Sequence, residues 1–394
     1  MQMAGNPIAA NIIVWLAGQQ GAMLALIERL VNTDSGSYDK AGVDAAGDIL
    51  KSHYRSIGLP PETIPNEHYG DAIRAVLPHP TTNDQRPVVL MGHRDTVFAK
   101  GEAGRRPFTI KDGKAYGPGV SDMKSGLVMN AFVIEAFKRF GGHPGPLVAL
   151  ITSDEEIASP ACRPIIEAEA RKARAVFNSE PGRPSGNVVT GRKGGVFMEF
   201  EVFGKASHSG GAYEAGISAI EELARKITQL HKVTDLARGT TVNVGLIRGG
   251  QTVNTVAPYA AGEIDMRYVT PADRAQALAQ IQAIVETCSL AGTSATLKIK
   301  GEFVALEQSA KSEQLFKLYQ GSVKDISGTE IAGEFTGGCA DSGLTAAQGC
   351  PTICSVGPIG AKAHTPEEYL EINSLVPRAQ AMALSIMQLA SAEI

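Results

Sequence analysis

The chain has 394 residues, 43% of them apolar, which suits about two or three folded domains. Its 37 basic and 41 acidic residues give a net charge of −4, so we expect no nucleic-acid-binding surface. No stretch approaches the roughly 18–20 apolar residues that cross a membrane, so we expect no membrane association.

The N-terminal segment contains a short apolar run, Ile12–Leu16, which we assign to an amphipathic helix continuing to Val31. No basic segment precedes this run, so we expect no signal peptide. The five cysteines are odd in number and match no zinc-binding spacing, so we expect free thiols in a reducing compartment. We therefore expect a cytoplasmic protein, or a periplasmic one if a signal peptide has been removed from this sequence.

The first part of the chain alternates between helical and strand patterns. Helical periodicity covers 21–58 with a turn at 33–36, followed by strands at 71–77 and 88–91, a helix at 125–140, a strand at 146–152, a helix at 159–173 and a strand at 176–178. This alternation predicts an α/β domain with a mostly parallel sheet. Ligands of such sheets bind beyond the carboxyl ends of the strands.

The middle of the chain has a different order of elements. We expect a strand at 195–203, a helix at 215–230, strands at 241–247 and 259–268, a helix at 271–288 and a strand at 296–300. The order β-α-β-β-α-β is that of a ferredoxin-like α+β domain. We therefore expect this domain, residues 190–302, as a lid inserted into a discontinuous larger domain of residues 1–189 and 303–394.

Histidines and carboxylates follow successive apolar strands in the pattern of a two-metal hydrolytic site. Asp122 lies in a loop rich in glycine and proline just before a helix, and we assign it as the carboxylate that bridges two divalent ions. We assign His93 and Glu180 to one ion, and Glu156 and His364 to the other. Ligands that are all nitrogen or oxygen favour Zn²⁺, with Mn²⁺ and Co²⁺ as alternatives.

Two further carboxylates near these ligands are assigned catalytic roles. Asp95 lies two residues beyond His93 and is close enough to accept the second ring proton, which would orient the imidazole. Glu155 is the general base for a water activated by the metal ions, and it would carry the proton to the leaving nitrogen.

One set of motifs extends over nearly the whole chain. Its members are His93-Arg94-Asp95, Gly117-Pro118-Gly119 with Asp122, Asp154-Glu155-Glu156, Glu180-Pro181, Gly204-Lys205-Ala206-Ser207-His208-Ser209-Gly210 and His364. This set resembles the M20 metallopeptidase family, and most of all its glutamate carboxypeptidase (carboxypeptidase G2-like) branch. The resemblance implies a di-zinc catalytic domain, a lid that forms a homodimer, a cis peptide after Asp122, and hydrolysis of amide bonds next to a free carboxylate.

The resemblance also gives roles to residues of the lid. It implies that His208 reaches the partner subunit's active site to stabilise the tetrahedral oxyanion, and that Arg267 binds the free carboxylate of the substrate. Asn254 matches an asparagine that contacts the substrate or oxyanion, and Gly337 and Gly338 belong to a glycine-rich loop beside the substrate. This chain departs from the family at Cys339–Ala340, where a small polar pair is more usual, which leaves the side-chain specificity open.

These residues predict a metal-dependent enzyme that releases a C-terminal glutamate, or a similar amino acid, from N-acyl or peptidyl substrates. An N-acyl amino acid deacylase, a dipeptidase or a small-molecule amidohydrolase on the same scaffold is the alternative, because specificity resides in the site. A non-catalytic metal- or ligand-binding protein is the alternative of another class. Simple binding would need none of Asp95, Glu155 and His208.

Overall fold

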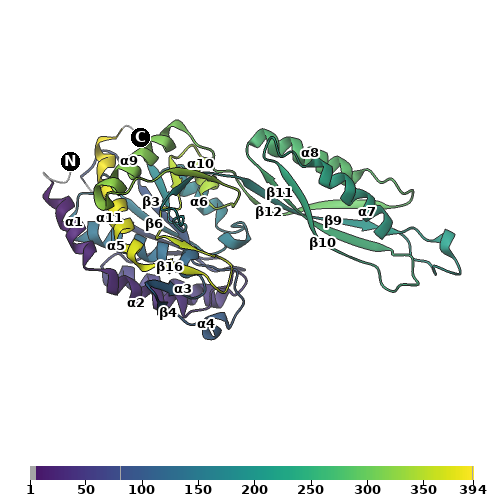
Figure 1. Cartoon of the computed structure of the whole chain (residues 1–394), viewed down its shortest axis with the longest axis horizontal. Coiled ribbons are helices and arrows are strands. Elements are labelled where there is room, and N and C mark those ends of the chain that lie inside the picture. Colours follow the sequence, from purple (N-terminus) through teal and green to yellow (C-terminus); the bar gives the residue numbers. More distant parts are fainter. Residues whose placement is uncertain (1–5, 80, 393) are drawn as a thin grey trace. The chain divides into compact units, whose positions relative to one another are not determined.

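The chain divides into two structural units in the computed structural model, which describes residues 6–79, 81–392 and 394 (Figure 1). The first unit extends to Gly191 and continues in Gln308–Phe335 and Leu344–Ile394; the second comprises Arg192–Glu307 and Thr336–Gly343. The second unit was expected to cover residues 190–302. Its observed main segment begins two residues later and ends five residues later, and residues 336–343 also belong to it. This loop belongs there because the backbone carbonyl of Thr336 accepts a hydrogen bond from the backbone N–H of Lys193 at 3.0 Å.

An eight-stranded sheet forms the centre of the first unit. Its strands, in spatial order, are β1 (Glu62–Ile64), β2 (Ala72–Leu77), β6 (Leu147–Thr152), β3 (Val88–His93), β7 (Ala175–Asn178), β14 (Thr352–Cys354), β8 (Val188–Arg192) and β13 (Gly333–Thr336). The central strands β6, β3, β7 and β14 pair in parallel, whereas β1, β2 and β8 pair antiparallel with their neighbours. The carboxyl ends of β6, β3 and β7 therefore lie at one edge of the sheet.

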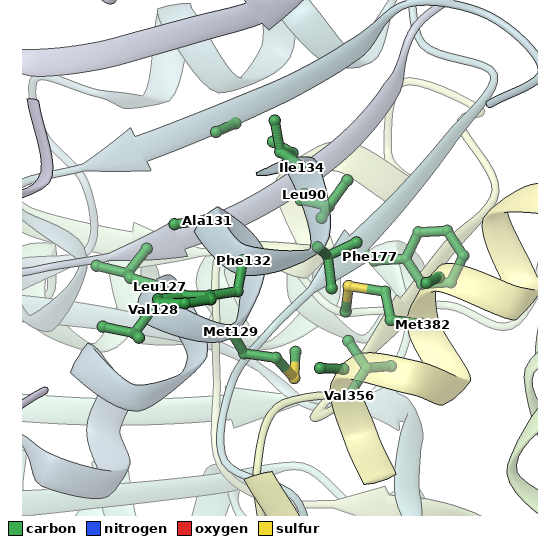
Figure 2. Packing of buried hydrophobic residues seen from close by; sticks show 14 of the residues in the cluster. Leu90, Leu127, Val128, Met129, Ala131, Phe132, Ile134, Phe177, Val356 and Met382 are labelled. Atoms are coloured by element: carbon green, nitrogen blue, oxygen red, sulfur yellow. The ribbon is translucent and has the colours of Figure 1, made fainter. Parts of the chain in front are cut away.

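Helices pack against this sheet to form the larger hydrophobic core. The helices with residues in this core are α1 (Pro7–Ala17), α2 (Gln20–Val31), α3 (Lys40–Ser56), α5 (Ser125–Phe140), α9 (Ala310–Ser327) and α11 (Ile372–Gln388). Among the described residues, the shorter helices α4 (Glu102–Arg105), α6 (Arg163–Ala170) and α10 (Ser342–Ala346) contribute none of its buried side chains. Figure 2 shows Leu90 of β3, Met129 of α5, Phe177 of β7 and Met382 of α11 in one apolar cluster, in which all four are buried. This packing fixes the strand ends relative to α5, which follows the loop of Asp122.

Two glycines allow α5 and its preceding loop to approach the strand ends closely. A Cβ atom on Gly92 would overlap the side chain of Met123, and one on Gly126 would overlap the backbone carbonyl of Ser179. Only glycine accommodates such contact between main chain and neighbour. The glycines thus bring the Asp122 loop against the ends of β3 and β7.

The N-terminal segment differs from the expected single helix. It forms α1 and α2, which Gly18 and Gln19 separate with a bend of 57°. Among the described residues no single helix has the length and apolarity to cross a membrane, although this bent pair together meets both criteria. The break was not apparent from the sequence, because Ile12, Leu16 and Leu30 are all buried against the same core and keep the apolar pattern continuous.

The chain also forms a second, smaller sheet. It consists of β15 (Gly360–Ala361), β16 (Tyr369–Glu371), β5 (Lys114–Tyr116) and β4 (Thr109–Lys111). The pairing of β16 with β5 brings the C-terminal segment that carries His364 to the segment that precedes Asp122. This pairing joins segments that are far apart in the chain, such as Tyr369 and Tyr116.

The second unit has the ferredoxin-like order of elements. Its strands β9 (Gly194–Phe203), β10 (Thr241–Gly249), β11 (Tyr259–Tyr268) and β12 (Ser294–Phe303) form an antiparallel sheet in the order β10-β11-β9-β12. Its helices α7 (Ala219–Leu230) and α8 (Pro271–Glu286) lie on one face of this sheet (Figure 1). Thr270 caps α8 through a capping box with Asp273, which agrees with a helix beginning at Pro271.

A buried ion pair joins α7 to the end of α8. Lys226 Nζ lies 2.9 Å from Glu222 Oε1 and donates to the carbonyl oxygens of Ile284 and Thr287, while Glu222 accepts the N–H groups of Ser289 and Leu290. Both charged side chains are only 1% exposed.

Replacing Lys226 by methionine is expected to lower the free energy of unfolding by about 3–5 kcal/mol, because it leaves the Glu222 charge buried without its partner. Urea denaturation measures this change. The matched control is Arg225→Met, which removes the exposed Arg225–Glu221 pair on the same helix and should cost less than about 1 kcal/mol. Equal effects of the two variants would contradict a special role for the buried pair.

Candidate metal centre

The carboxyl ends of three adjacent parallel strands bring together the first group of functional side chains. His93 is the last residue of β3 and pairs in register with Thr152 of β6. Glu155 and Glu156 lie in a short 3₁₀ turn, Glu155–Ile157, just after β6, and Glu180 lies two residues after β7. The order of the strands thus explains why side chains from distant parts of the sequence converge.

Asp122 lies in a tight turn, Val120–Lys124, between β5 and α5. The peptide bond between Asp122 and Met123 is cis, as the resemblance implies. Gly119 precedes the turn with a φ of 73°, a left-handed conformation that glycine adopts without strain. Lys124 is buried and donates from Nζ to the carbonyl oxygens of Thr33 and Pro118 at 3.1 and 3.3 Å, and burial lowers its pKa to about 8.

Asp122 presents one carboxylate oxygen to each of two groups of donor atoms. Oδ1 lies 3.2 Å from His93 Nε2, which is 3.7 Å from Glu180 Oε1. Oδ2 lies 3.4 Å from His364 Nε2, which is 3.1 Å from Glu156 Oε2. The structure therefore brings all five expected ligands together, grouped as His93–Asp122–Glu180 and Asp122–Glu156–His364 with Asp122 common to both.

The orientation of His93 directs Nε2 toward these carboxylates. Its other ring nitrogen, Nδ1, donates to the backbone carbonyl oxygen of Asp95 at 3.1 Å, which leaves Nε2 as the atom that can bind a metal. The Asp95 carboxylate is farther from Nδ1, with Oδ1 at 3.4 Å. The main-chain oxygen of Asp95 is the closer acceptor and the carboxylate lies just beyond it, so the expected role of the carboxylate in orienting the imidazole stays a prediction.

The carboxylate of Asp95 also holds the turn that carries the two glutamates. It accepts the hydroxyl of Ser37 at 2.7 Å and the backbone N–H groups of Glu155 and Glu156, each at 3.2 Å. Glu155 Oε2 lies 3.8 Å from His93 Nε2, within the same cluster as the ligands. Asp95 thereby fixes the position of the expected general base and of one expected ligand.

His364 comes from a loop at the other end of the chain. It has a φ of 64°, in the left-handed region that histidine enters more often than most residues. Arg106 donates to the carbonyl oxygen of Pro366 at 3.0 Å, which ties this loop to the segment before β4. The imidazole is half exposed, so it lies at the open side of the cluster.

A carboxylate that the sequence analysis did not identify anchors the Asp122 turn. Glu368 is fully buried and accepts the backbone N–H groups of Gly119, Ser121 and Asp122 at 3.0, 2.9 and 2.9 Å. Burial raises the pKa of Glu368 to about 7. In the sequence, only its position four residues after His364 points to this role, and the exposed Glu367 beside it has nearly the same position.

The charges of the cluster fit divalent cations. Burial lowers the pKa of His93, but the charge of Glu155 and the hydrogen bond to Asp122 outweigh this and raise it well above its usual value. Hydrogen bonds to Asp122 and Glu156 raise the pKa of His364 to about 10, while burial and the charge of Asp122 raise that of Glu156. Carboxylates crowded in this way need positive charge among them, and a set of imidazole and carboxylate donors suits Zn²⁺, Mn²⁺ or Co²⁺.

Replacing Glu368 by glutamine is expected to lower metal affinity by about 10- to 100-fold, because an amide group cannot accept all three N–H groups that hold the Asp122 turn. Titration with a metal ion, followed by calorimetry, measures this affinity. Glu367→Gln, at the exposed neighbouring position, is the control and should bind as the unaltered chain does. Unchanged affinity in the Glu368 variant would show that the turn does not need this carboxylate.

The second unit contains the remaining expected site residues. His208 is exposed, and its Nδ1 accepts the N–H groups of Gly210 and Gly211 at 3.1 and 3.0 Å. The proton of the neutral ring is therefore on Nε2, which is a hydrogen-bond donor. Asn254 lies beside His208, because the backbone carbonyl oxygen of Asn254 accepts a hydrogen bond from the backbone N–H of Ser209 at 2.9 Å.

The other group of expected substrate residues is on a different part of this unit. Arg267 is on β11, and Gly337 and Gly338 are exposed residues of the loop 336–343. The backbone carbonyl of Gly338 accepts a hydrogen bond from Arg192 at 3.2 Å. His208 and Asn254 thus form one pair. Arg267 lies with the glycine-rich loop, because its Nη1 atom contacts Sγ of Cys339.

Known proteins share this sequence pattern and fold. Residues 89–388 match the model of peptidase family M20/M25/M40. Carboxypeptidase G2 of Pseudomonas sp. (strain RS-16) is 27% identical over 98% of this chain and 95% of its own length, and succinyl-diaminopimelate desuccinylase of Psychrobacter sp. (strain PRwf-1) is 28% identical over 75% and 78%. The structure of an M20 family metallo-carboxypeptidase from Sulfolobus solfataricus superimposes with a TM-score of 0.76 at 18% identity, covering 93% of this chain and 98% of that one. The chain therefore belongs to peptidase family M20/M25/M40 and is a metal-dependent hydrolase.

Proposed function

We propose that this chain hydrolyses an amide bond next to a free carboxylate and releases a C-terminal glutamate, or a similar amino acid, from N-acyl or peptidyl substrates. The observation that carries the proposal is the sharing of Asp122 between two groups of metal ligands, with Glu155 beside them. Two Zn²⁺ ions are the proposed cofactors, held by His93, Asp122 and Glu180 and by Asp122, Glu156 and His364. The similarity to carboxypeptidase G2 over nearly the whole chain supports a carboxypeptidase.

The cations would lower the pKa of a water molecule and polarise the substrate carbonyl. Glu155 accepts the proton of the attacking water and then delivers it to the leaving nitrogen. The Nε2–H group of His208 donates a hydrogen bond to the oxygen that becomes negatively charged in the transition state. Arg267 binds the free carboxylate of the substrate, a task for which a planar guanidinium is suited.

A homodimer formed through the second unit is part of this proposal. The strand β10 lies at an edge of its sheet and carries the exposed apolar side chains Leu246 and Ile247. An exposed apolar edge strand can pair with the same strand of a second copy. Sedimentation tests this assembly: a monomer with full activity would exclude the delivery of His208 to the partner's site.

A second candidate function is the removal of an acyl group from an N-acyl amino acid, in which the amino acid is not glutamate. The matches to succinyl-diaminopimelate desuccinylase and acetylornithine deacetylase favour it. Metal-loaded protein should be assayed by liquid chromatography on N-acyl-glutamates, N-acyl-aspartates, dipeptides, acetylated amino acids and succinylated diamino acids. Preferential release of glutamate supports the first proposal; preference for an acetylated or succinylated diamino acid supports the second, and no turnover at all contradicts both.

A further inference from the structure

Arg267 is held in one orientation by a set of contacts within the second unit. Its Nε and Nη2 atoms donate to the two carboxylate oxygens of Asp265 at 2.7 and 3.0 Å. Its guanidinium also lies over the ring of Phe197, with Cζ 5.2 Å from the ring centre. A bidentate ion pair on one edge and an aromatic ring on one face together restrict the plane of the guanidinium.

A third contact comes from the loop in which this chain departs from its family. Nη1 of Arg267 lies 2.7 Å from Sγ of Cys339, which is partly buried. Burial raises the pKa of the Cys339 thiol, although the charge of Arg267 opposes this. Burial thus favours the neutral thiol, which contacts Arg267 without cancelling the positive charge that a ligand would meet.

The contact between Arg267 and Cys339 depends on a glycine in the neighbouring strand. Gly195 of β9 pairs in register with Arg267 of β11. A Cβ atom at Gly195 would lie 3.0 Å from Cys339 Sγ and 3.2 Å from Arg267 Nη1, which is tighter than ordinary packing. Glycine at this position thus provides the space in which thiol and guanidinium meet.

The number of N–H groups on Arg267 then limits what it can bind. A guanidinium has five N–H groups, and the bonds to Asp265 and Cys339 use one each on Nε, Nη2 and Nη1. One N–H group remains on each of the two terminal nitrogens. Two N–H groups on neighbouring nitrogens match the two oxygens of one planar carboxylate.

We propose that Cys339 is a specificity-determining residue, which together with Asp265 and Gly195 fixes Arg267 so that it presents one pair of N–H donors to a planar carboxylate. This inference rests on the proposed function, in which Arg267 binds the free carboxylate of the substrate. Cys339 acts as a positioning residue: its Sγ atom contacts Nη1 of Arg267, so a carboxylate bound to this guanidinium would also shield the thiol. Its consequence is selection of a carboxylate over a carboxamide at this place in the substrate.

Steady-state kinetics test the selection directly, with N-benzoyl-L-glutamate and its α-carboxamide, N-benzoyl-L-isoglutamine, as substrates. Cys339→Ala is expected to raise KM for benzoyl-glutamate about five- to tenfold, the effect of losing roughly one hydrogen bond, with kcat nearly unchanged and no change for the carboxamide. Cys339→Ser, which keeps an acceptor for Nη1, should restore the original KM. Gly195→Ala should raise KM as Cys339→Ala does. Unchanged KM in the alanine variant at position 339 would overturn the inference.

A labelling experiment tests the same site without turnover. Iodoacetamide alkylation of each thiol is followed by mass spectrometry in the presence of glutarate or of glutaramide, its uncharged counterpart. Glutarate at four times its Kd should slow the alkylation of Cys339 about fivefold, whereas glutaramide should not. Cys288, which is also partly exposed and lies in the same unit, is the internal control and should react equally in all samples.

The two experiments separate failure of this inference from failure of the proposed function. Protection of Cys339 by glutarate without hydrolysis of any acyl-glutamate would remove the proposed function and leave the inference standing. Hydrolysis of acyl-glutamates without protection of Cys339 would overturn the inference and leave the function standing.

Discussion

Replacing Glu155 by glutamine is expected to lower kcat by about 10²- to 10⁴-fold, the usual contribution of a general acid–base residue. The amide has almost the same shape as the carboxylate, but it cannot accept a proton from the attacking water. Because Glu155 is not assigned as a ligand, the variant should bind as many metal ions as the unaltered chain. Turnover of the preferred acyl amino acid, together with metal analysis by plasma mass spectrometry, measures both quantities.

The adjacent residue provides the matched control for this experiment. Glu156 Oε2 lies 3.1 Å from His364 Nε2, in the second group of ligands. Glu156→Gln should therefore lose both activity and metal, whereas Glu155→Gln should lose activity alone. A Glu155 variant that keeps its turnover, or that loses metal as the Glu156 variant does, would contradict the role of general base.

Replacing Asp122 by asparagine is expected to have the largest effect on metal binding. Asparagine has one oxygen where the carboxylate has two, so it cannot serve both groups of ligands, and it removes one negative charge from the cluster. The loss of affinity should exceed the roughly 10- to 100-fold that removal of an outer hydrogen-bond partner causes, and kcat/KM should fall with it. Metal stoichiometry after dialysis measures the effect.

Asp112→Asn is the control for the Asp122 variant. Asp112 is exposed and has a φ of 50°, a left-handed conformation that asparagine also tolerates. The variant makes the same chemical change ten residues earlier in the chain and should bind metal normally. Full metal content and full activity in the Asp122 variant would exclude this residue as a bridge.

Much of the fold could be predicted because periodic patterns were long and uninterrupted. The helix predicted at 125–140 and the strand predicted at 259–268 have the same bounds as α5 and β11. In each element the residues of the apolar pattern are buried in the core of its own unit, so local pattern and tertiary packing agree. The parallel centre of the first sheet followed from the alternation of strands and helices in the same way.

Other elements were missed because their neighbours in space determine them. The strands β4 and β5 have only three residues each, and pairing between them and with β16 defines them. The helix predicted from 159 begins only at Arg163, since Ala161 and Cys162 donate their backbone N–H groups to the carboxylate of Asp154. The local sequence pattern contains no information about such contacts with other segments of the chain.

In the candidate site, too, some residues could be predicted from the sequence and others could not. His93, Glu155, Glu156 and Glu180 could be predicted to converge, because each follows an apolar strand of one parallel sheet. Glu368 could not be distinguished from Glu367 by sequence, although one carboxylate holds the Asp122 turn and the other is exposed. The roles of His208, Arg267 and Asn254 came from the family resemblance and remain predictions.

The central claim is that Asp122 lies between two cations, and anomalous X-ray diffraction at the zinc edge tests it most directly. In crystals grown with Zn²⁺, two anomalous peaks should flank Asp122, one reached by His93 and Glu180 and the other by Glu156 and His364. Each peak should lie about 2.0–2.2 Å from its nitrogen and oxygen ligands. A single peak, or none among these five side chains, would contradict the account.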